Sequence, residues 1–323
     1  SIDENEVENL RKIGNEIFGE DNFVAQLTII VKTEGRRYGY FAKTHEYMLV
    51  YSKSIEKLKL NELEVVGKKF KYSDLIGGFD LKELRNQNTK AFNSTNRPNL
   101  RYPFYVDEST ADEDKLMKVS VDKKSNYTEV NAITVDGLKR VWRWGKDTAM
   151  KKESDSLIAR KGSDGVIRIF QKYRSSTQTA KTVWFDKEII SIKGTKKIQE
   201  LFGGKTVFDF PKPVELIRKI IEIGTNSNEI VIDFFSGSCT TGHAILDYNI
   251  RDSRNLNFIT IQLPEIIENG HEALSFDCET LCDIAKERIR RVVQKIKEEN
   301  PEKSKEMDLG FKVFKLDSSN IKS

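Results

Sequence analysis

The sequence predicts an α/β fold whose chain is interrupted by an inserted α+β segment. At 230–248 a short apolar run ends at an acid, and a turn of small residues and a helical segment follow, which is the strand–turn–helix order of doubly wound sheets. The run 281–296 has the spacing of a long amphipathic helix. Between 73 and 190 the pattern changes to short strand-like runs and asparagine-rich loops, which indicates a separate segment.

The first part of the chain alternates between helix and strand patterns. Residues 4–18 have apolar side chains at helical spacing and end at Gly19, so we expect a helix with one buried face. The apolar runs 24–31 and 47–51 predict two strands, with a loop at 35–39 between them. The apolar face of the helix consists of Val7, Leu10, Ile13 and Ile17.

The remaining elements follow from the same patterns. The middle of the chain has strand-like runs at 128–133, 166–170 and 181–185. The last part predicts a helix at 216–223, a strand at 230–233, a helix from 242, a strand at 258–262, the long helix 281–296 and a final edge strand at 311–315. The expected domain boundaries are therefore 1–72, 73–190 and 191–323.

Composition places the chain among globular proteins with a sizeable core. Hydrophobic residues make up 38% and charged residues 32% of the 323 positions, with a net charge of +4. No apolar run reaches the length of about 18 residues that a membrane-spanning helix needs, and the N-terminal stretch lacks a secretory signal. The three cysteines are too few for a disulfide framework and have no zinc-like spacing with the three histidines. We therefore expect a cytoplasmic protein without a metal site.

The turn at 236–242 has the features of a site for a nucleotide-like cofactor. Its small residues let the backbone approach a ligand, and the helix that follows begins with unpaired N–H groups. It is not a dinucleotide fingerprint, because Cys239 stands where a second glycine would be, and no Gly-Lys-Ser/Thr follows as in a P-loop. On these residues alone, a structural turn without a ligand remains an alternative.

Several segments together resemble one family. The residues 233–241 resemble the D-x-F-x-G-S-G-T-T motif by which amino-methyltransferases acting on DNA bind S-adenosylmethionine. Phe-Asp-Phe-Pro-Lys-Pro begins the segment 208–221 upstream, and His-Glu-Tyr-Met begins the segment 45–53 near the start. In this order the pieces resemble the methylation (Mod) subunit of Type III restriction–modification systems, a group of β-class DNA adenine-N6 methyltransferases.

The resemblance implies a Rossmann-like S-adenosylmethionine-dependent methyltransferase sheet, incomplete here, with an inserted α+β target-recognition domain. Residues 1–72 would form the second half of the catalytic sheet, 73–190 the DNA-binding domain and 191–323 the cofactor-binding part. Cys239 replaces a glycine of the family turn, so we expect backbone strain and crowding of the cofactor there. The implied cofactor-binding residues are Lys212, Pro213, Glu215, Asp233, Phe235, Ser236, Gly237, Ser238, Thr240, Gln262 and Glu265, the last as a substitute for Gln262 in the ribose contact.

No catalytic residue is assigned, because the D-P-P-Y tetrad of the family is missing. The six prolines include no adjacent pair. Residues 1–6 resemble a family segment that follows the tetrad, so we expect a chain that lacks its N-terminal part, is inactive alone and has an exposed sheet edge. The resemblance also implies double-stranded DNA, a restriction (Res) subunit and a second copy of the chain as partners, and no membrane.

A basic stretch with interspersed aromatic and amide side chains runs from 139 to 181. Such cations neutralise phosphates, and Arg, Asn and Gln side chains read base edges, although a solvated surface fits these residues equally well. Tyr38 and Tyr40 either stack on an extruded base or pack on the core. Given the family, we expect DNA contacts from Arg140, Arg143, Lys146, Arg168, Lys172 and Arg174.

Two other functions stay open. One is a non-catalytic DNA-recognition module, which differs from the methyltransferase in whether the turn at 236–242 still binds a cofactor. The other is a nucleotide-binding oxidoreductase, which is disfavoured because Cys239 breaks the dinucleotide fingerprint and because the segment 208–213 has no role in such an enzyme.

Overall fold

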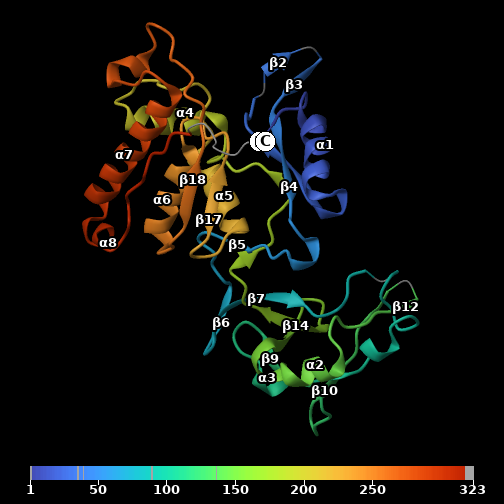
Figure 1. Ribbon diagram of the computed structural model, residues 1–323. Coiled ribbons are helices and arrows are strands. Elements are labelled where there is room, and N and C mark those ends of the chain that lie inside the picture. Colours follow the sequence, from blue (N-terminus) through green and yellow to red (C-terminus); the bar gives the residue numbers. More distant parts are fainter. Residues whose placement is uncertain (1, 35, 39, 89, 136, 317–323) are drawn as a thin grey trace. The chain divides into compact units, whose positions relative to one another are not determined.

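The chain divides into two compact units (Figure 1). The computed structural model describes residues 2–34, 36–38, 40–88, 90–135 and 137–316. The discontinuous unit comprises Ser1–Leu63 and Thr179–Ser323, and the inserted unit comprises Glu64–Gln178. The chain passes from one to the other through two short paired strands, β5 (Leu63–Glu64) and β15 (Thr177–Gln178).

The inserted unit is built on one antiparallel sheet of seven strands in the order β10-β8-β9-β13-β14-β7-β6. Its core contains Phe104, Trp142 and Ile169. Trp142 lies in the basic stretch but is buried, and its indole N–H donates to the carbonyl of Tyr102 at 2.7 Å. It is therefore a core residue and is not available to a ligand.

The elements of the inserted unit are short. Its sheet consists of β6 (Tyr72–Asp74), β7 (Gly77–Glu83), β8 (Phe104–Asp107), β9 (Leu116–Ser120), β10 (Thr128–Val130), β13 (Leu157–Lys161) and β14 (Ile167–Tyr173). A hairpin, β11 (Thr134–Val135) with β12 (Leu138–Lys139), and the helices α2 (Lys146–Lys151) and α3 (Glu153–Ser156) complete it.

The discontinuous unit contains separate small sheets in place of the single sheet that we expected. A three-stranded sheet has the order β16-β1-β4, and β17 and β18 form a parallel pair. The strands are β1 (Phe23–Ile30), β4 (His45–Tyr51), β16 (Val183–Trp184), β17 (Ile230–Asp233) and β18 (Asn257–Thr260), and the helices are α1 (Val7–Phe18), α4 (Ser191–Leu201), α5 (Val214–Gly224), α6 (Thr240–Asp252), α7 (Leu281–Glu299) and α8 (Pro301–Lys305).

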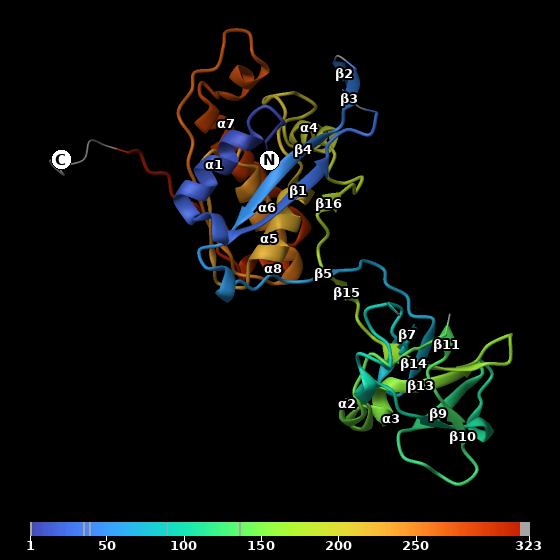
Figure 2. The same ribbon diagram turned by 90° about the vertical axis from the view of Figure 1, so that its right-hand side faces the viewer.

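Helix α5 joins these two sheets into one unit. Its Leu216 packs with Ile29 and Trp184 of the three-stranded sheet. On another face, Val214 and Ile221 pack with residues of α6 and with β17 and β18. Figure 1 shows α5 beside β17, and Figure 2 shows α1, β1 and β4 in front of α5 and α6. A single amphipathic helix therefore supports both parts of the fold.

Two apolar surfaces of this unit are uncovered within the described residues. The α1 helix forms as expected, but the face that we expected to be buried is largely exposed, with Ile17 at 68%. On β17 one face packs on the helices through Val231, whereas Ile232 on the other face is 49% exposed. Doubly wound sheets bury both faces, so this strand pair is covered on one side only.

Two local predictions were wrong. Within the expected loop 35–39, residues Arg36–Tyr38 form a short strand, β2, which pairs with β3 (Phe41–Lys43). The segment 311–315 forms no strand; Phe311 instead packs against a cluster that contains Ile289 and Leu309. In both cases the deciding factor is a partner that local sequence patterns do not specify.

The described helices include none that is long and apolar enough to cross a membrane. In the same residues, no group of three or more His, Cys, Asp or Glu side chains is arranged to hold a metal ion.

Candidate cofactor-binding site

The turn between β17 and α6 is tight and partly left-handed. The N–H of Cys239 donates to the carbonyl of Ser236 at 2.7 Å, which closes the turn. Gly237 has φ 50°, and a Cβ placed on it would lie 3.0 Å from the ring of Phe208. Only glycine meets both conditions without strain, so the glycine of the predicted motif has a clear physical role here.

Cys239 adopts the left-handed conformation that we expected to be costly, with φ 59°. Its side chain, however, packs into the core near Leu246 and Ile289, and its Sγ lies 3.6 Å from Oγ1 of Thr260. The expected crowding of a ligand by this side chain is therefore wrong. Burial raises the pKa of the Cys239 thiol, which stays protonated and unreactive.

Asp233 connects the two ends of the turn. Its Oδ2 accepts a hydrogen bond from Oγ1 of Thr241 at 2.5 Å, and its Oδ1 accepts one from the N–H of Phe235 at 3.2 Å. The acid that follows the predicted strand thus joins the end of β17 to the first turn of α6. Removing this carboxylate would release both sides of the turn.

Gln262 follows β18 and reaches the same turn. Its side-chain oxygen accepts a hydrogen bond from the N–H of Gly237 at 2.8 Å, and its amide donates to the carbonyl of Leu263 at 3.3 Å. Glu265 is exposed and lies 3.5 Å from the Gln262 amide. Both predicted residues are thus near the turn, with Gln262 holding it directly.

Exposed aromatic rings flank the turn. Phe235 is 94% exposed, and Phe234 and Phe210 are also exposed. Phe210 has a left-handed backbone, with φ 51°, in the upstream segment that places Phe208 on Gly237. Exposed rings beside the start of a helix combine apolar and polar binding surface, as small-molecule sites do.

Beneath the turn lies a buried network that sequence reasoning missed. Arg288 of α7 is fully buried and donates through Nη1 to Oγ of Ser238 at 2.8 Å and to Oγ1 of Thr240 at 2.8 Å. Its Nη2 lies 3.2 Å from Nδ1 of His243, whose Nε2 lies 3.2 Å from Oδ2 of Asp247. Ser238 and Thr240, which we expected at the cofactor, are turned toward this guanidinium.

The signal for Arg288 is present in the sequence. It stands in the apolar stripe of the long helix, four positions after Ile284 and four before Val292, and all three side chains are buried. A charged residue within such a stripe is rarely buried unless it has partners, so it marks a buried polar site.

Burial sets the protonation of this network. It lowers the pKa of Arg288 to about 10, which still leaves the side chain charged at neutral pH. Burial also lowers the pKa of His243, the nearby Arg288 charge lowers it further, and the hydrogen bond to Asp247 offsets this only in part. His243 is therefore neutral, accepting from Arg288 at Nδ1 and donating to Asp247 from Nε2.

The upstream segment is anchored from two sides. Lys212 donates to Oε2 of Glu46 on β4 at 2.6 Å, and Glu215 accepts from Nε of Arg218 at 2.8 Å. Pro213 is buried at the start of α5. A Cβ on Gly194 of α4 would lie 2.0 Å from the carbonyl oxygen of Pro211, so α4 and this segment are in close contact. Lys212 therefore holds the segment against β4, whereas the ion pair of Glu215 lies within α5.

The basic residues of the inserted unit fall into two groups. Three predicted DNA contacts on β14 or directly after it are paired within the unit: Arg168 with Asp164 in a bidentate contact, and Lys172 and Arg174 with the shared carboxylate of Asp74. The hydrogen bond from Arg174, with that from Lys172, holds the pKa of Asp74 well below its ordinary value.

The other predicted DNA contacts differ in exposure. Lys146 is exposed at the start of α2, whereas Arg140 and Arg143 are half-buried, and burial lowers the pKa of Arg143. Tyr40 is fully open to solvent, which excludes packing on the core, while the side chain of Tyr38 lies outside the described residues.

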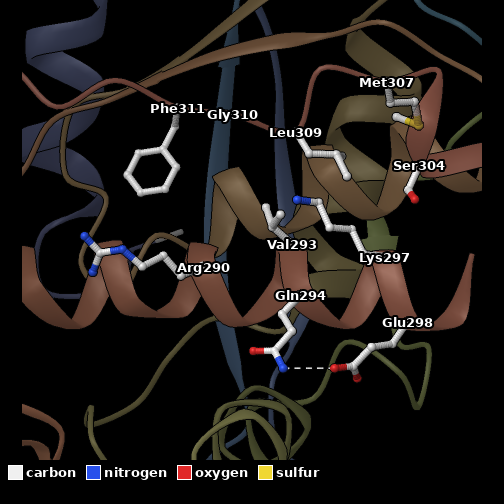
Figure 3. Close-up of a pocket in the computed structure, with 10 residues that line it drawn as sticks. All are labelled: Arg290, Val293, Gln294, Lys297, Glu298, Ser304, Met307, Leu309, Gly310 and Phe311. Atoms are coloured by element: carbon white, nitrogen blue, oxygen red, sulfur yellow. Dashed lines mark hydrogen bonds between the residues drawn. The ribbon is translucent and has the colours of Figure 1, made fainter. Parts of the chain in front are cut away.

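A separate hollow of about 750 Å³ lies between α7 and the segment 304–311 (Figure 3). In Figure 3, Val293 and Lys297 project from the helix toward Leu309 on the facing segment. None of the predicted site residues lines this hollow. It is therefore distinct from the β17–α6 turn.

Comparison with known proteins identifies the family. Residues 1–290 match the DNA methylase family N6_N4_Mtase, and the chain belongs to this family. It is 31% identical over 97% of its length to the Type III restriction-modification enzyme EcoPI Mod subunit of Escherichia phage P1, of which it covers 49%. It is 30% identical over 90% of its length to the Type II methyltransferase M.KpnI of Klebsiella pneumoniae, of which it covers 68%.

The chain thus spans about half the length of the Mod relative. Among solved structures, the PvuII cytosine-N4-specific DNA methyltransferase aligns over 40% of this chain and 47% of that chain, at 17% identity and a TM-score of 0.21. This value is too low to define the fold. The α/β character of the chain follows from its own strands and helices.

Proposed function

We propose that this chain is the cofactor-binding and DNA-recognition part of a site-specific DNA adenine-N6 methyltransferase of a restriction–modification system, with S-adenosylmethionine as methyl donor. The observation that carries the proposal is the β17–α6 turn, which Asp233 and Gln262 hold at the carboxyl end of a parallel strand. Ligands of open α/β sheets bind at this position. The family and the Mod relatives supply the class of reaction and substrate.

The residues of the turn fit this cofactor. Gly237 allows the left-handed turn, and the 13-residue helix α6 begins directly after it, where helices bind anionic groups. The start of α6 would hold the polar end of the cofactor, and the exposed ring of Phe235 would cover its apolar surface. When bound, S-adenosylmethionine would supply an activated methyl group.

The chain's own residues do not complete the chemistry. Acceptor groups must hold the target amine so that its lone pair faces the methyl group, and the D-P-P-Y tetrad that provides them in the family is absent. We therefore propose that the chain is inactive alone and acts together with a segment that carries this tetrad. By likeness to the Type III Mod subunit, a restriction (Res) subunit and a second copy of the chain are the proposed protein partners.

The inserted unit is the proposed reader of double-stranded DNA. Its basic stretch provides the charge for phosphate contacts, and Lys146 is exposed for this purpose. Base edges would be read by neighbouring side chains, with the target adenine rotated out of the duplex. The proposal gives the two units different tasks: the discontinuous unit binds the cofactor, and the inserted unit binds DNA.

Calorimetric titration with S-adenosylmethionine tests the proposal. The wild-type chain should bind, and Asp233→Ala should abolish binding because it releases both ends of the turn. Asp252→Ala, an exposed acid at the end of α6, should bind as the wild type does. Failure of the wild type to bind would overturn the proposal that this chain binds the cofactor and would favour the non-catalytic DNA-recognition module.

A further inference from the structure

The guanidinium of Arg288 contacts both the β17–α6 turn and helix α6. The side chain extends from α7 to the turn, where Nη1 bonds Oγ of Ser238, Oγ1 of Thr240 and, at 3.3 Å, the carbonyl of Ser238. Its Nε and Nη2 both lie near Nδ1 of His243 on α6, at 3.3 and 3.2 Å. One guanidinium therefore ties together the turn, the first residue of α6 and the second turn of that helix.

The charge of this side chain has no directly bonded carboxylate. Among the ion pairs of the described residues none involves Arg288, and its partners are hydroxyl groups, a carbonyl and a neutral histidine. The nearest acid in the network is Asp247, one histidine ring away and 35% exposed. The Arg288 charge therefore lies directly beneath the turn, while the balancing carboxylate of Asp247 lies on the far side of the His243 ring, in a medium where charges interact strongly.

Packing alone does not account for an arginine at this position. Its neighbours in the stripe, Ile284, Val292 and Ile296, show that the helix is otherwise apolar toward the core. Burying a charge is costly and an apolar residue of similar volume would avoid that cost, so the charge itself is the property that needs explanation.

The charge lies where an anionic ligand group would benefit from it. The amide groups at the start of α6 already favour an anion, and the guanidinium bound to Thr240 adds a full positive charge at the same end of the helix. S-adenosylmethionine has one anionic group, the carboxylate of its amino-acid part. The buried charge and the polarity of the helix would favour the same group.

We propose that Arg288 is a positioning residue that fixes the β17–α6 turn from beneath and makes it selective for a cofactor with a carboxylate. This inference rests on the proposed function, because it assumes that S-adenosylmethionine binds at the turn. It assigns a task to a residue that lies behind the site and touches no ligand. It also explains why Ser238 and Thr240 point inward: their hydroxyl groups hold the guanidinium in place.

The test compares two ligands that differ only in the carboxylate: S-adenosylmethionine and decarboxylated S-adenosylmethionine. Calorimetry should show that the wild-type chain prefers the first, and that Arg288→Met reduces this preference by about tenfold. Arg288→Lys keeps the charge but loses the planar set of N–H donors of the guanidinium. It should bind both ligands more weakly and keep the preference within about threefold of the wild type. Arg290→Met, an exposed position on the same helix, should change neither affinity.

A spectroscopic measurement on the free chain supports the same comparison. The chain has three histidines, so the ring nitrogens of His243 can be assigned by NMR with a His243→Gln variant. In the wild type, His243 should be a single tautomer protonated at Nε2. In Arg288→Met, Nδ1 of His243 should take up a proton at a higher pH than in the wild type, because the Arg288 charge and its donated hydrogen bonds no longer oppose this, while Asp247 still holds the proton at Nε2. Should Arg288→Met fail to fold, Arg288→Gln, uncharged but able to hydrogen-bond, takes its place.

The outcomes separate the two proposals. Wild-type binding of S-adenosylmethionine with an unchanged carboxylate preference in Arg288→Met or Arg288→Gln would overturn the role of Arg288 and leave the proposed function standing. A wild-type chain that binds neither ligand would overturn both. Loss of preference in the charge-free variants, together with its retention in Arg288→Lys, is the expected result.

Discussion

At the scale of single residues, the candidate site depends on side chains that hold the turn from beneath. Protonation of one of them, His243, would disrupt this support. As a neutral ring it accepts from Arg288 and donates to Asp247. As a charged ring it would face the Arg288 guanidinium with no lone pair to offer, and Lys197 of α4 would add to the repulsion. The folded state therefore disfavours the protonated form.

This predicts a specific dependence of stability on pH. In an unfolded chain a histidine takes up a proton below about pH 6.5, whereas buried His243 takes it up only at a lower pH. The unfolded state then binds more protons, so the free energy of unfolding decreases as the pH falls below about 6.5, by up to about 1.4 kcal/mol per pH unit. Above this value the contribution of His243 stays constant.

Urea unfolding followed through amide signals of α6, at several pH values between about 5 and 7.5, measures this effect. His243→Gln has no titrating ring and serves as the control, so its curve should be flatter below pH 6.5. Parallel curves for the two proteins would show that His243 does not resist protonation in the fold.

The residues of the site differ in how well the sequence predicts them. Asp233 and Gly237 were found because an acid and small residues after a buried strand form a local pattern. The bonding partners of Arg288 are 45 to 50 positions away in the chain, so no local pattern links them. Its place within an apolar stripe was the available signal, and it indicates burial without identifying the partners.

At the scale of elements, strands and helices with strong local periodicity were predicted best. The strand β17 has the predicted bounds, Ile230–Asp233, and the helices α1, α5 and α7 occur where their apolar spacing placed them. The pairing of strands was predicted less well, because β17 and β1 belong to separate sheets where we expected one. Pairing depends on residues far apart in the sequence, and periodicity does not specify it.

The secondary-structure elements also determine which basic side chains are exposed and able to contact DNA. Lys146 is exposed at the first position of α2, whereas Lys172 on β14 is largely buried and donates to Asp74 at 2.8 Å. We expect Lys146→Ala to weaken binding of a duplex and to reduce the slope of log affinity against log salt by about one, with no change in melting temperature. Lys172→Ala should lower the free energy of unfolding by about 1 kcal/mol and leave the salt slope unchanged.

Fluorescence anisotropy with a labelled duplex at several salt concentrations, and thermal unfolding of each variant, check this pair. The two substitutions remove the same charge, so each is the matched control for the other. A reduced salt slope in Lys172→Ala would show that this lysine leaves Asp74 to contact phosphate, as the sequence alone suggested. An unchanged slope in Lys146→Ala would place the DNA surface elsewhere on the inserted unit.

At the scale of the whole molecule, the sequence predicted the α/β class and the presence of an inserted segment, but not how the discontinuous unit covers its apolar faces. Single residues such as Ile13 and Ile232 follow the expected patterns and yet are exposed. Burial depends on what lies opposite a face. The chain spans about half of the Mod relative, and within the described residues β17 has a strand partner on one side only.

This exposure predicts self-association of the chain. An unpaired strand edge beside an exposed apolar face is a surface on which another chain can pair or pack, because both the backbone groups and the apolar side chains gain partners. Light scattering coupled to gel filtration at increasing concentration should therefore show species larger than a monomer.

Substitutions on the exposed faces test this prediction. Ile232→Glu places a charge in the middle of the exposed face of β17 and should shift the distribution toward the monomer. Ile17→Glu should do the same if the exposed face of α1 contributes to association. Ile192→Glu changes an equally exposed isoleucine on α4 and should have no effect. A wild-type chain that stays monomeric at the highest concentration would contradict the prediction. The short length of the β17 edge would then be what prevents it from pairing with another chain.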